Sequence, residues 1–179
     1  MQDSFPSKVW LILGSNVGDR MQNLHLALTE LTGLPDTRLE VVSSIYETAP
    51  WGETDQPWFY NIAIEIGTAL EPLELLNSAK LIETRLGRRP GPKWGPRVID
   101  IDLILWEDRV VTTPDLTIPH PLFTERAFVL IPMNDIAPLC VDPNSGLTME
   151  QLLAMVEGRD SVKRNDESDL SSIIRQQDQ

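Results

Sequence analysis

Two aspartates and a group of basic residues lie close together in the chain, where residues 94–106 read WGPRVIDIDLILW. From 98 to 106, β-branched and apolar residues alternate with carboxylates, which predicts a β-strand. Because neighbouring side chains of a strand point to opposite faces, Asp100 and Asp102 are expected to project from the same face. The apolar residues of the other face are expected to point into a core: Ile99, Ile101, Leu103 and Leu105. Two carboxylates this close repel each other unless a cation lies beside them, and a hard divalent ion fits that position.

The residues just before this strand include five bases with no acid between them: Arg85, Arg88, Arg89, Lys93 and Arg97. Aspartates that hold magnesium, beside arginines that bind phosphate oxygens, predict phosphoryl transfer. An Asp-x-Asp pair on a strand is by itself more often a solvated face than a metal site. The neighbouring basic cluster favours the metal site. Residues 88–93 combine bases with prolines and a glycine, which predicts a lid beside the strand.

The composition limits the class of protein. A chain of 179 residues with 41% hydrophobic residues can form one domain with a buried core. Its formal net charge of -12 disfavours binding to nucleic acid and to anionic membranes. The single cysteine, Cys140, excludes an intramolecular disulfide, and two histidines with one cysteine are too few for a typical structural zinc site. No apolar run approaches the ~20 residues of a membrane span. We therefore expect a cytoplasmic protein.

The periodicity of the rest of the chain predicts the elements that position these residues. Strands are expected at 8–13, 38–46, 60–66 and 98–106, and helices at 21–31 and 72–86. This order is the split βαβ arrangement of a ferredoxin-like α+β fold, with a mainly antiparallel sheet and helices packed on one face. We expect a single domain over 1–158, ending in a short helix capped by Thr148 and Gln151. A polar tail over 159–179 is expected to be poorly ordered.

Three further segments offer side chains to a site. The connection 47–58 is long and rich in tryptophan, which is typical of a functional loop. Its tryptophans are equally compatible with packing on the sheet edge and with contacting a ligand. Glu83 is either a charge on a helix surface or a site residue directed at the basic loop. His120 lies between two prolines that fix its backbone, and Arg126 and Phe128 follow closely.

Short motifs occur in order along the chain: LGSN at 13–16, YET at 46–48, DQP at 55–57, FYN at 59–61, WGPRVIDID at 94–102, IPHP at 118–121 and RAF at 126–128. In these motifs, which run from 13 to about 138, the chain resembles the 6-hydroxymethyl-7,8-dihydropterin pyrophosphokinase family of folate biosynthesis. The resemblance implies transfer of the terminal pyrophosphate of ATP to the hydroxymethyl oxygen of a reduced pterin, with release of AMP.

The resemblance also implies roles for particular residues. Asp100 and Asp102 would bind two Mg²⁺ ions that bridge the phosphates of ATP. Arg88, Arg97 and His120 would handle phosphate charge and, with the two aspartates, form the catalytic set. The nucleotide would be bound by these three residues together with Glu83, Ile104 and Thr117. The pterin would be bound by Thr48, Pro50, Phe59, Asn61, Trp94, Arg126 and Phe128, with the flat ring between the two phenylalanines.

A flat polar heterocycle requires aromatic faces for stacking and a few groups that read its edge. Phe59 and Asn61 would leave their strand on one face, which we infer to be the face that carries Asp100 and Asp102. The expected partners are small molecules, ATP and the reduced pterin, and a monomer is expected. Two alternatives remain open. A non-catalytic ferredoxin-like nucleotide-sensing module would bind ATP without magnesium, and a nucleotidyltransferase would release pyrophosphate instead of AMP.

Overall fold

The computed structural model describes residues 7–166 and Leu170. Its elements follow one another as β1 (Ser7–Ser15), α1 (Arg20–Thr32), β2 (Thr37–Val42), β3 (Ile45–Thr48), β4 (Phe59–Thr68), α2 (Pro72–Arg85), β5 (Asp100–Trp106), β6 (Val111–Thr112), β7 (Thr117–Ile118), α3 (Ala127–Ile136), α4 (Met149–Met155) and β8 (Val162–Asn165). Short 3₁₀ turns occur at Phe123–Glu125 and Arg159–Ser161. In the described part of the chain, no helix is long and apolar enough to cross a membrane.

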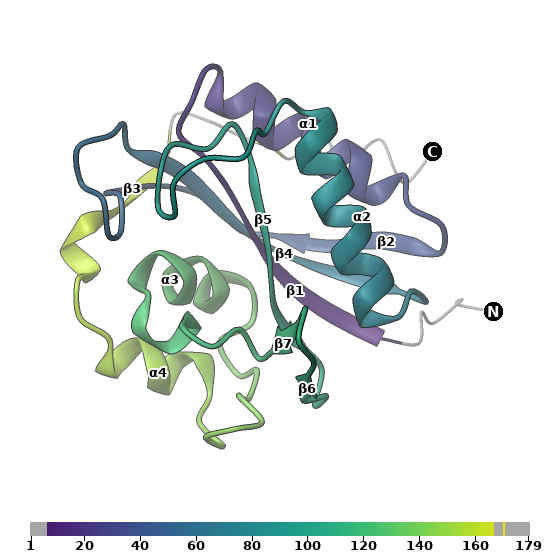
Figure 1. The fold of residues 1–179 in the computed structure, drawn as a ribbon. Coiled ribbons are helices and arrows are strands. Elements are labelled where there is room, and N and C mark those ends of the chain that lie inside the picture. Colours follow the sequence, from purple (N-terminus) through teal and green to yellow (C-terminus); the bar gives the residue numbers. More distant parts are fainter. Residues whose placement is uncertain (1–6, 167–169, 171–179) are drawn as a thin grey trace.

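The main sheet has the strand order β5-β1-β4-β3-β8, and β2 pairs with β4 beside β3 (Figure 1). Every pairing in this sheet is antiparallel. The edge strand β5 therefore lies next to β1, and β1 lies next to β4. This topology confirms the ferredoxin-like α+β fold that the order of elements predicted.

Helices cover both faces of the sheet. On one face, Leu28 of α1 and Ile82 of α2 join a core with Val9, Leu11 and Ile64 of the strands. On the other face, Leu130 of α3 and Leu152 of α4 form a second core with the strand side chains that point to that face: Trp10, Ile12 and Ala63. The expectation of helices on one face therefore holds for α1 and α2, and α3 and α4 add a second layer (Figure 1).

The ends of the helices follow from local sequence. Asp19 caps α1 by accepting a hydrogen bond from the backbone N–H of Gln22, and Gly33 ends that helix. Pro72 occupies the first turn of α2, where a missing N–H costs nothing. Thr148 and Gln151 form the predicted capping box at the start of α4.

The predicted strand at 38–46 is interrupted in the structure, so it forms two strands, β2 and β3. At the break, the hydroxyl of Ser43 accepts the hydrogen bond from the backbone N–H of Ala63 at 2.9 Å. The next backbone N–H, that of Ser44, donates to a carboxylate oxygen of Asp135 at 2.8 Å instead of continuing the ladder. Side-chain bonds thus replace part of the backbone pairing at this point, where the N–H of Ser43 still donates to the carbonyl of Ala63 at 2.9 Å.

Strand β5 contains a β-bulge at Ile104. Leu103 pairs with Leu11 and Leu105 pairs with Trp10, so Ile104 has no partner in β1. Beyond the bulge the facing of side chains reverses: Leu105 joins the core under α3 and α4, whereas Trp106 joins the core under α1 and α2. The prediction that Leu105 shares a face with Leu103 is therefore wrong.

The end of the chain is also more structured than expected. Residues Val162–Asn165 form β8, which pairs with β3, and Leu170 is buried in the core under α1 and α2. The expectation of poor order therefore does not hold for residues Arg159 to Asn165, which form a 3₁₀ turn and β8. The rest of the expected tail, 167–169 and 171–179, lies outside the described residues.

Candidate active site

The floor of the site is a row across three neighbouring strands. Gly14 of β1 pairs with Asn61 of β4 on one side and with Asp100 of β5 on the other. A Cβ at Gly14 would collide with Oδ1 of Asn61, so glycine leaves the space that the amide occupies. Asn61 donates from its amide to the hydroxyl of Thr48 at 2.6 Å, and both side chains are buried. In the next row, Ile12 lies opposite Asp102.

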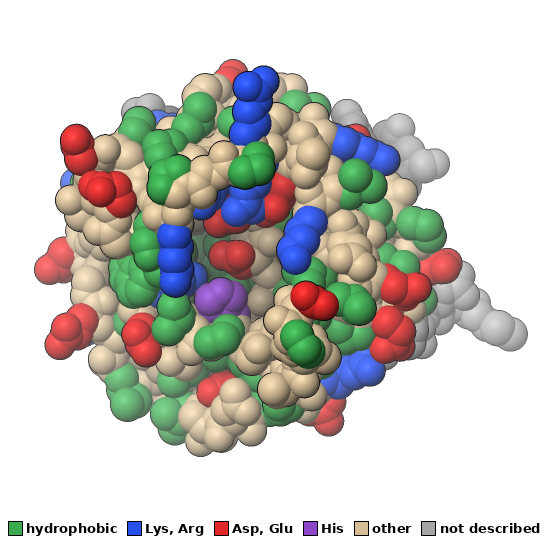
Figure 2. Space-filling view, in the orientation of Figure 1, with side chains coloured by type: hydrophobic (Ala, Val, Ile, Leu, Met, Phe, Trp, Pro, Cys, Tyr) green, Lys and Arg blue, Asp and Glu red, His purple; other side chains and the backbone are tan. Residues whose placement is uncertain are grey.

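A cavity of about 250 Å³ lies above this floor. Figure 2 shows it as a hollow with carboxylates and a histidine inside and basic side chains around its rim. It is lined by Ile12, Gly14, Thr48, Ala49, Trp51, Phe59, Asn61, Arg88, Lys93, Trp94, Gly95, Arg97, Asp100, Asp102, His120, Arg126 and Phe128. The structure thus brings together all the expected site residues except Pro50, Glu83, Ile104 and Thr117.

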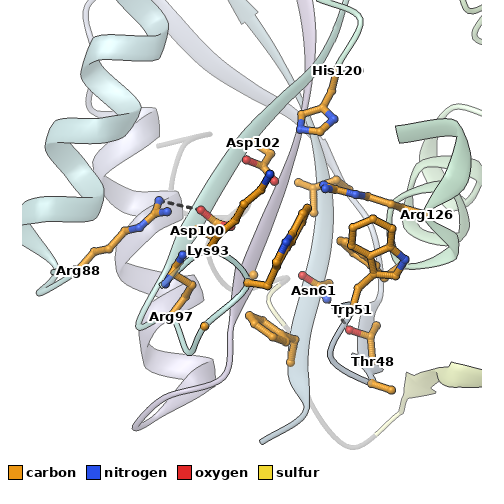
Figure 3. A pocket seen from close by; sticks show the side chains of 17 residues that line it. Thr48, Trp51, Asn61, Arg88, Lys93, Arg97, Asp100, Asp102, His120 and Arg126 are labelled. Carbon is orange, nitrogen blue, oxygen red and sulfur yellow. Dashed lines mark hydrogen bonds and ion pairs between the residues drawn. The ribbon is translucent and has the colours of Figure 1, made fainter. Parts of the chain in front are cut away.

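One side of the cavity is a network of opposite charges. Nη1 of Arg88 lies 2.7 Å from Oδ1 of Asp100 (Figure 3). The same nitrogen also pairs with Oε2 of Glu83. The other carboxylate oxygen of Glu83 accepts the backbone N–H of Ile101 at 2.7 Å. Glu83 is buried, and burial, with Asp100 nearby, raises its pKa to about 7. Glu83 is therefore directed at the site, behind Arg88, and is not a helix-surface charge.

The pKa values of Asp102 and His120 are both shifted from the ordinary values of these groups. Burial, followed by repulsion from Asp100, raises the pKa of Asp102 to about 7. Burial, followed by the positive charge of Arg126, lowers the pKa of His120 to about 4. The imidazole is neutral at pH 7, and its Nδ1 accepts the backbone N–H of Leu122 at 3.2 Å. The remaining nitrogen, Nε2, therefore carries the proton of the neutral ring.

The bulge in β5 positions His120. The carbonyl of Ile104, the residue without a partner in β1, accepts the backbone N–H of His120 at 2.9 Å. The side chain of Ile104 itself is fully buried in the core under α3 and α4, away from the cavity. Thr117 is exposed on β7, and Pro50 is buried beside the cavity without lining it.

Aromatic rings and one guanidinium form the opposite side of the cavity. The guanidinium carbon of Arg126 lies 4.8 Å from the ring centre of Trp51, 5.3 Å from that of Trp94 and 5.6 Å from that of Phe128. The rings of Trp51 and Trp94 meet edge to face, 4.8 Å apart. The sequence left the role of the tryptophans in 47–58 open. The structure places Trp51 in the cavity wall (Figure 3).

Two polar residues without a predicted role connect the loops around the cavity. Asn16 donates to the side chain of Gln56 at 3.0 Å and accepts the backbone N–H of Arg97 at 2.8 Å. Gln56 in turn donates to the carbonyl of Trp94 at 2.6 Å. The LGSN and DQP motifs contain these two residues, and this was the only sequence signal for them. Their bonds hold the loop before β4 against the loop before β5.

The chemistry of the donor set fits magnesium bound together with a phosphate. Within residues 7–166 and Leu170, no three acidic, histidine or cysteine side chains converge as a complete protein metal site. Magnesium is usually held by one or two carboxylates, with substrate phosphates and water filling its other positions. Asp100 and Asp102, with Arg88, Lys93 and Arg97 around them, provide that kind of site.

A ferredoxin-like sheet with paired carboxylates, phosphate-binding bases and an aromatic wall in one cavity defines a transferase of phosphate groups that acts on a flat acceptor. Residues 10–138 match the family model described as 7,8-dihydro-6-hydroxymethylpterin-pyrophosphokinase. The chain belongs to this family. It is therefore an ATP-dependent pyrophosphokinase, which acts in folate biosynthesis.

Individual relatives agree with this assignment. The chain is 43% identical, over 84% of its length and 94% of the relative's, to the 2-amino-4-hydroxy-6-hydroxymethyldihydropteridine pyrophosphokinase of Methylorubrum extorquens. It is 44% identical to the Bacillus subtilis protein of the same name, over 71% of this chain and 76% of that one. A crystal structure of Plasmodium falciparum HPPK-DHPS shares the fold, with a TM-score of 0.70 and 17% identity over 91% of this chain. This chain spans 48% of that longer one.

Proposed function

We propose that the cavity described above is where pyrophosphate passes from ATP to the hydroxymethyl group of 6-hydroxymethyl-7,8-dihydropterin. The observation that carries this proposal is that the carboxylates and the aromatic wall face each other across one cavity. A polyphosphate can therefore reach Asp100 and Asp102 while a flat ring rests against Phe59 and Phe128. The reaction requires this proximity of donor and acceptor.

The charged side of the cavity would bind the triphosphate. Asp100 and Asp102 would hold two Mg²⁺ ions, which when bound supply neutralisation of charge on the phosphate oxygens. Arg88 and Arg97 would bind phosphate oxygens as these gain charge. In the structure, Nη1 of Arg88 pairs with Asp100, and Nη2 of Arg97 donates to the carbonyl of Pro92 at 3.0 Å, and each guanidinium has further N–H groups that would donate to phosphate. His120 would donate a neutral Nε2–H to a phosphate oxygen.

Residues behind the cavity would act through others. Glu83 would hold Arg88 and the backbone of β5 in place, because it contacts both. Ile104 would support the nucleotide site through its carbonyl, which fixes His120. Thr117 would contact the part of the nucleotide that extends beyond the cavity. These roles agree with the nucleotide set that the family resemblance implies.

The aromatic side would bind the pterin. Its ring would stack between Phe59 and Phe128, and the amide of Asn61, held by Thr48, would read the polar edge. The backbone next to Pro50 would read the same edge. Trp94 and Arg126 would close over the site.

We further propose a cytoplasmic monomer with no nucleic-acid partner and one main domain, 1–158, completed by β8. The net charge of -12 supports the absence of a nucleic-acid role, and the bases Arg88, Lys93, Arg97 and Arg126 line a small cavity instead of an extended surface. The single cysteine supports a compartment without disulfide formation.

Product analysis tests the proposal directly. The protein is mixed with ATP, Mg²⁺ and 6-hydroxymethyl-7,8-dihydropterin, and nucleotides and pterins are separated by chromatography. We expect AMP and the diphosphorylated pterin in equal amounts. ADP would indicate transfer of one phosphoryl group, free pyrophosphate would indicate nucleotidyl transfer, and ATP binding without any product would indicate a nucleotide sensor. Each of these three results would overturn the proposal.

A further inference from the structure

Trp51 and Trp58 belong to the same loop but have different surroundings. Their exposed fractions are nearly the same, 38% and 37%. Trp51 lines the cavity, whereas Trp58 lies outside it, with the ammonium of Lys163 5.4 Å from its ring centre. Exposed tryptophan surface is unfavourable in water, and Trp51 places its surface at the mouth of a ligand cavity.

The ring of Trp51 contacts the guanidinium of Arg126. This guanidinium is buried and surrounded by the rings of Trp51, Trp94 and Phe128, of which Trp51 lies nearest. Its Nε–H has no hydrogen-bond partner among the described residues. A buried donor without a partner costs free energy, which a ligand with an acceptor atom would recover. Stacking on rings fixes the plane of a guanidinium and leaves its N–H groups free to bind in that plane.

Trp51 also packs against Trp94, which belongs to the loop before β5. Its ring packs edge to face on Trp94, and the adjacent Gly52 has a positive φ of 90° and approaches the Trp94 ring so closely that a Cβ would lie 3.0 Å from it. Two loops from opposite sides of the cavity thus meet at this pair of rings. The position of Trp51, and with it that of Arg126, depends on both loops.

We propose that Trp51 is a positioning residue for the acceptor substrate: it orients the guanidinium of Arg126 so that its N–H groups meet acceptor atoms on the edge of the pterin ring. This inference rests on the proposed function of the cavity. It assigns to Trp51 a role in pterin affinity that is exerted through Arg126. Nucleotide affinity should change less than pterin affinity, because Arg88 and Arg97 lie across the cavity from Trp51 (Figure 3).

The test compares Trp51→Ala, Trp51→Phe and the matched control Trp58→Ala. The dissociation constant of the pterin is measured by fluorescence titration in the presence of Mg²⁺ and a non-hydrolysable ATP analogue, and that of the analogue is measured separately. We expect Trp51→Ala to weaken pterin binding about tenfold, as expected for loss of a partly desolvated cation–π contact. Trp51→Phe should recover most of this affinity, Trp58→Ala should match the wild type, and Trp51→Ala should change affinity for the analogue much less than affinity for the pterin.

A double-mutant cycle with Arg126→Ala separates positioning from a general packing role. If Trp51 acts through Arg126, Trp51→Ala should have little further effect on pterin affinity in the Arg126→Ala background. An undiminished tenfold loss there, or a pterin affinity unchanged in Trp51→Ala alone, would overturn the inference. Equal weakening of pterin and analogue would overturn it too, because it would indicate disruption of the whole cavity. Failure of the wild-type protein to bind the pterin would instead refute the proposed function.

Discussion

Replacing Gly14 by alanine should damage the floor of the cavity, even though the change adds only one methyl group. The new Cβ would overlap Oδ1 of Asn61, and it would lie 3.5 Å from Cγ of the same residue. Asn61 must then rotate, which breaks its hydrogen bond with Thr48 and leaves the hydroxyl of this residue, which is 1% exposed, without this donor. The lost bond and the unpaired buried group together cost about 2–3 kcal/mol, and local overpacking alone costs a similar amount.

Urea denaturation of Gly14→Ala should therefore show stability lowered by about 2–3 kcal/mol with an unchanged m-value. Pterin affinity should fall much more than ATP affinity, because Asn61 reads the pterin edge. Gly33→Ala is the control: Gly33 has a negative φ, and a Cβ there would lie 3.4 Å from its nearest neighbour. The double variant Gly14→Ala with Asn61→Ser removes the overlap, so it should regain stability but not pterin binding. Wild-type stability and pterin affinity in Gly14→Ala would refute this account of the floor.

Three other expectations concern the aspartates and the end of the chain. Asp102→Asn should keep the fold, as judged by circular dichroism, and lower the rate of AMP formation by several orders of magnitude, since it removes a proposed metal ligand; near-normal turnover would exclude Asp102 from the mechanism. In the absence of nucleotide, the affinity for Mn²⁺, followed by electron paramagnetic resonance, should fall as the pH is lowered through about 7. The sign follows from the raised pKa of Asp102: below it the carboxyl holds a proton that the metal must displace, and above it the proton is already lost. Affinity that is independent of pH between 6 and 8 would contradict this. Truncation after Gly158 should lower the thermal unfolding temperature, because it removes β8 and the buried Leu170. Truncation after Asp166 retains β8 and should lower this temperature less. Equal unfolding temperatures for the full-length chain and both truncated chains would show that neither segment contributes to stability.

The parts of the fold that the sequence predicted correctly are those with a clear periodicity. The helix stripes, their caps and the alternation from Asp100 to Leu103 gave the correct elements and the correct face for the two aspartates. Across Leu103, Ile104 and Leu105 all residues are apolar, so no polar side chain marks the change of face, and the bulge could not be predicted. Strand β8 is polar and short, and its pairing with β3 joins segments more than a hundred residues apart. Local sequence contains no signal for such a contact.

The site was predictable to a different degree. Family motifs located most of the residues that line the cavity, but they gave no physical role for Asn16 or Gln56, whose bonds cross between loops. Polar loop residues lack periodicity, so only the folded chain shows what they contact. The same holds for Trp51, because a tryptophan in a loop packs on a sheet edge or faces a ligand depending on how the loop closes.

The bulge in β5 has a consequence for changes in chain length. Ile104 is one residue more than the pairing with β1 requires, so a chain that lacks it could keep every other residue of β5 on its present face. The carbonyl that holds His120 would then be lost, which would damage the nucleotide site, and the loss of a fully buried side chain would also lower stability. A deletion at Ile101 would instead bring Asp100 and Asp102 next to each other in sequence, on opposite faces of the strand. Within this one strand, a single-residue deletion can therefore preserve the faces of the remaining side chains at one position and separate the two carboxylates at another.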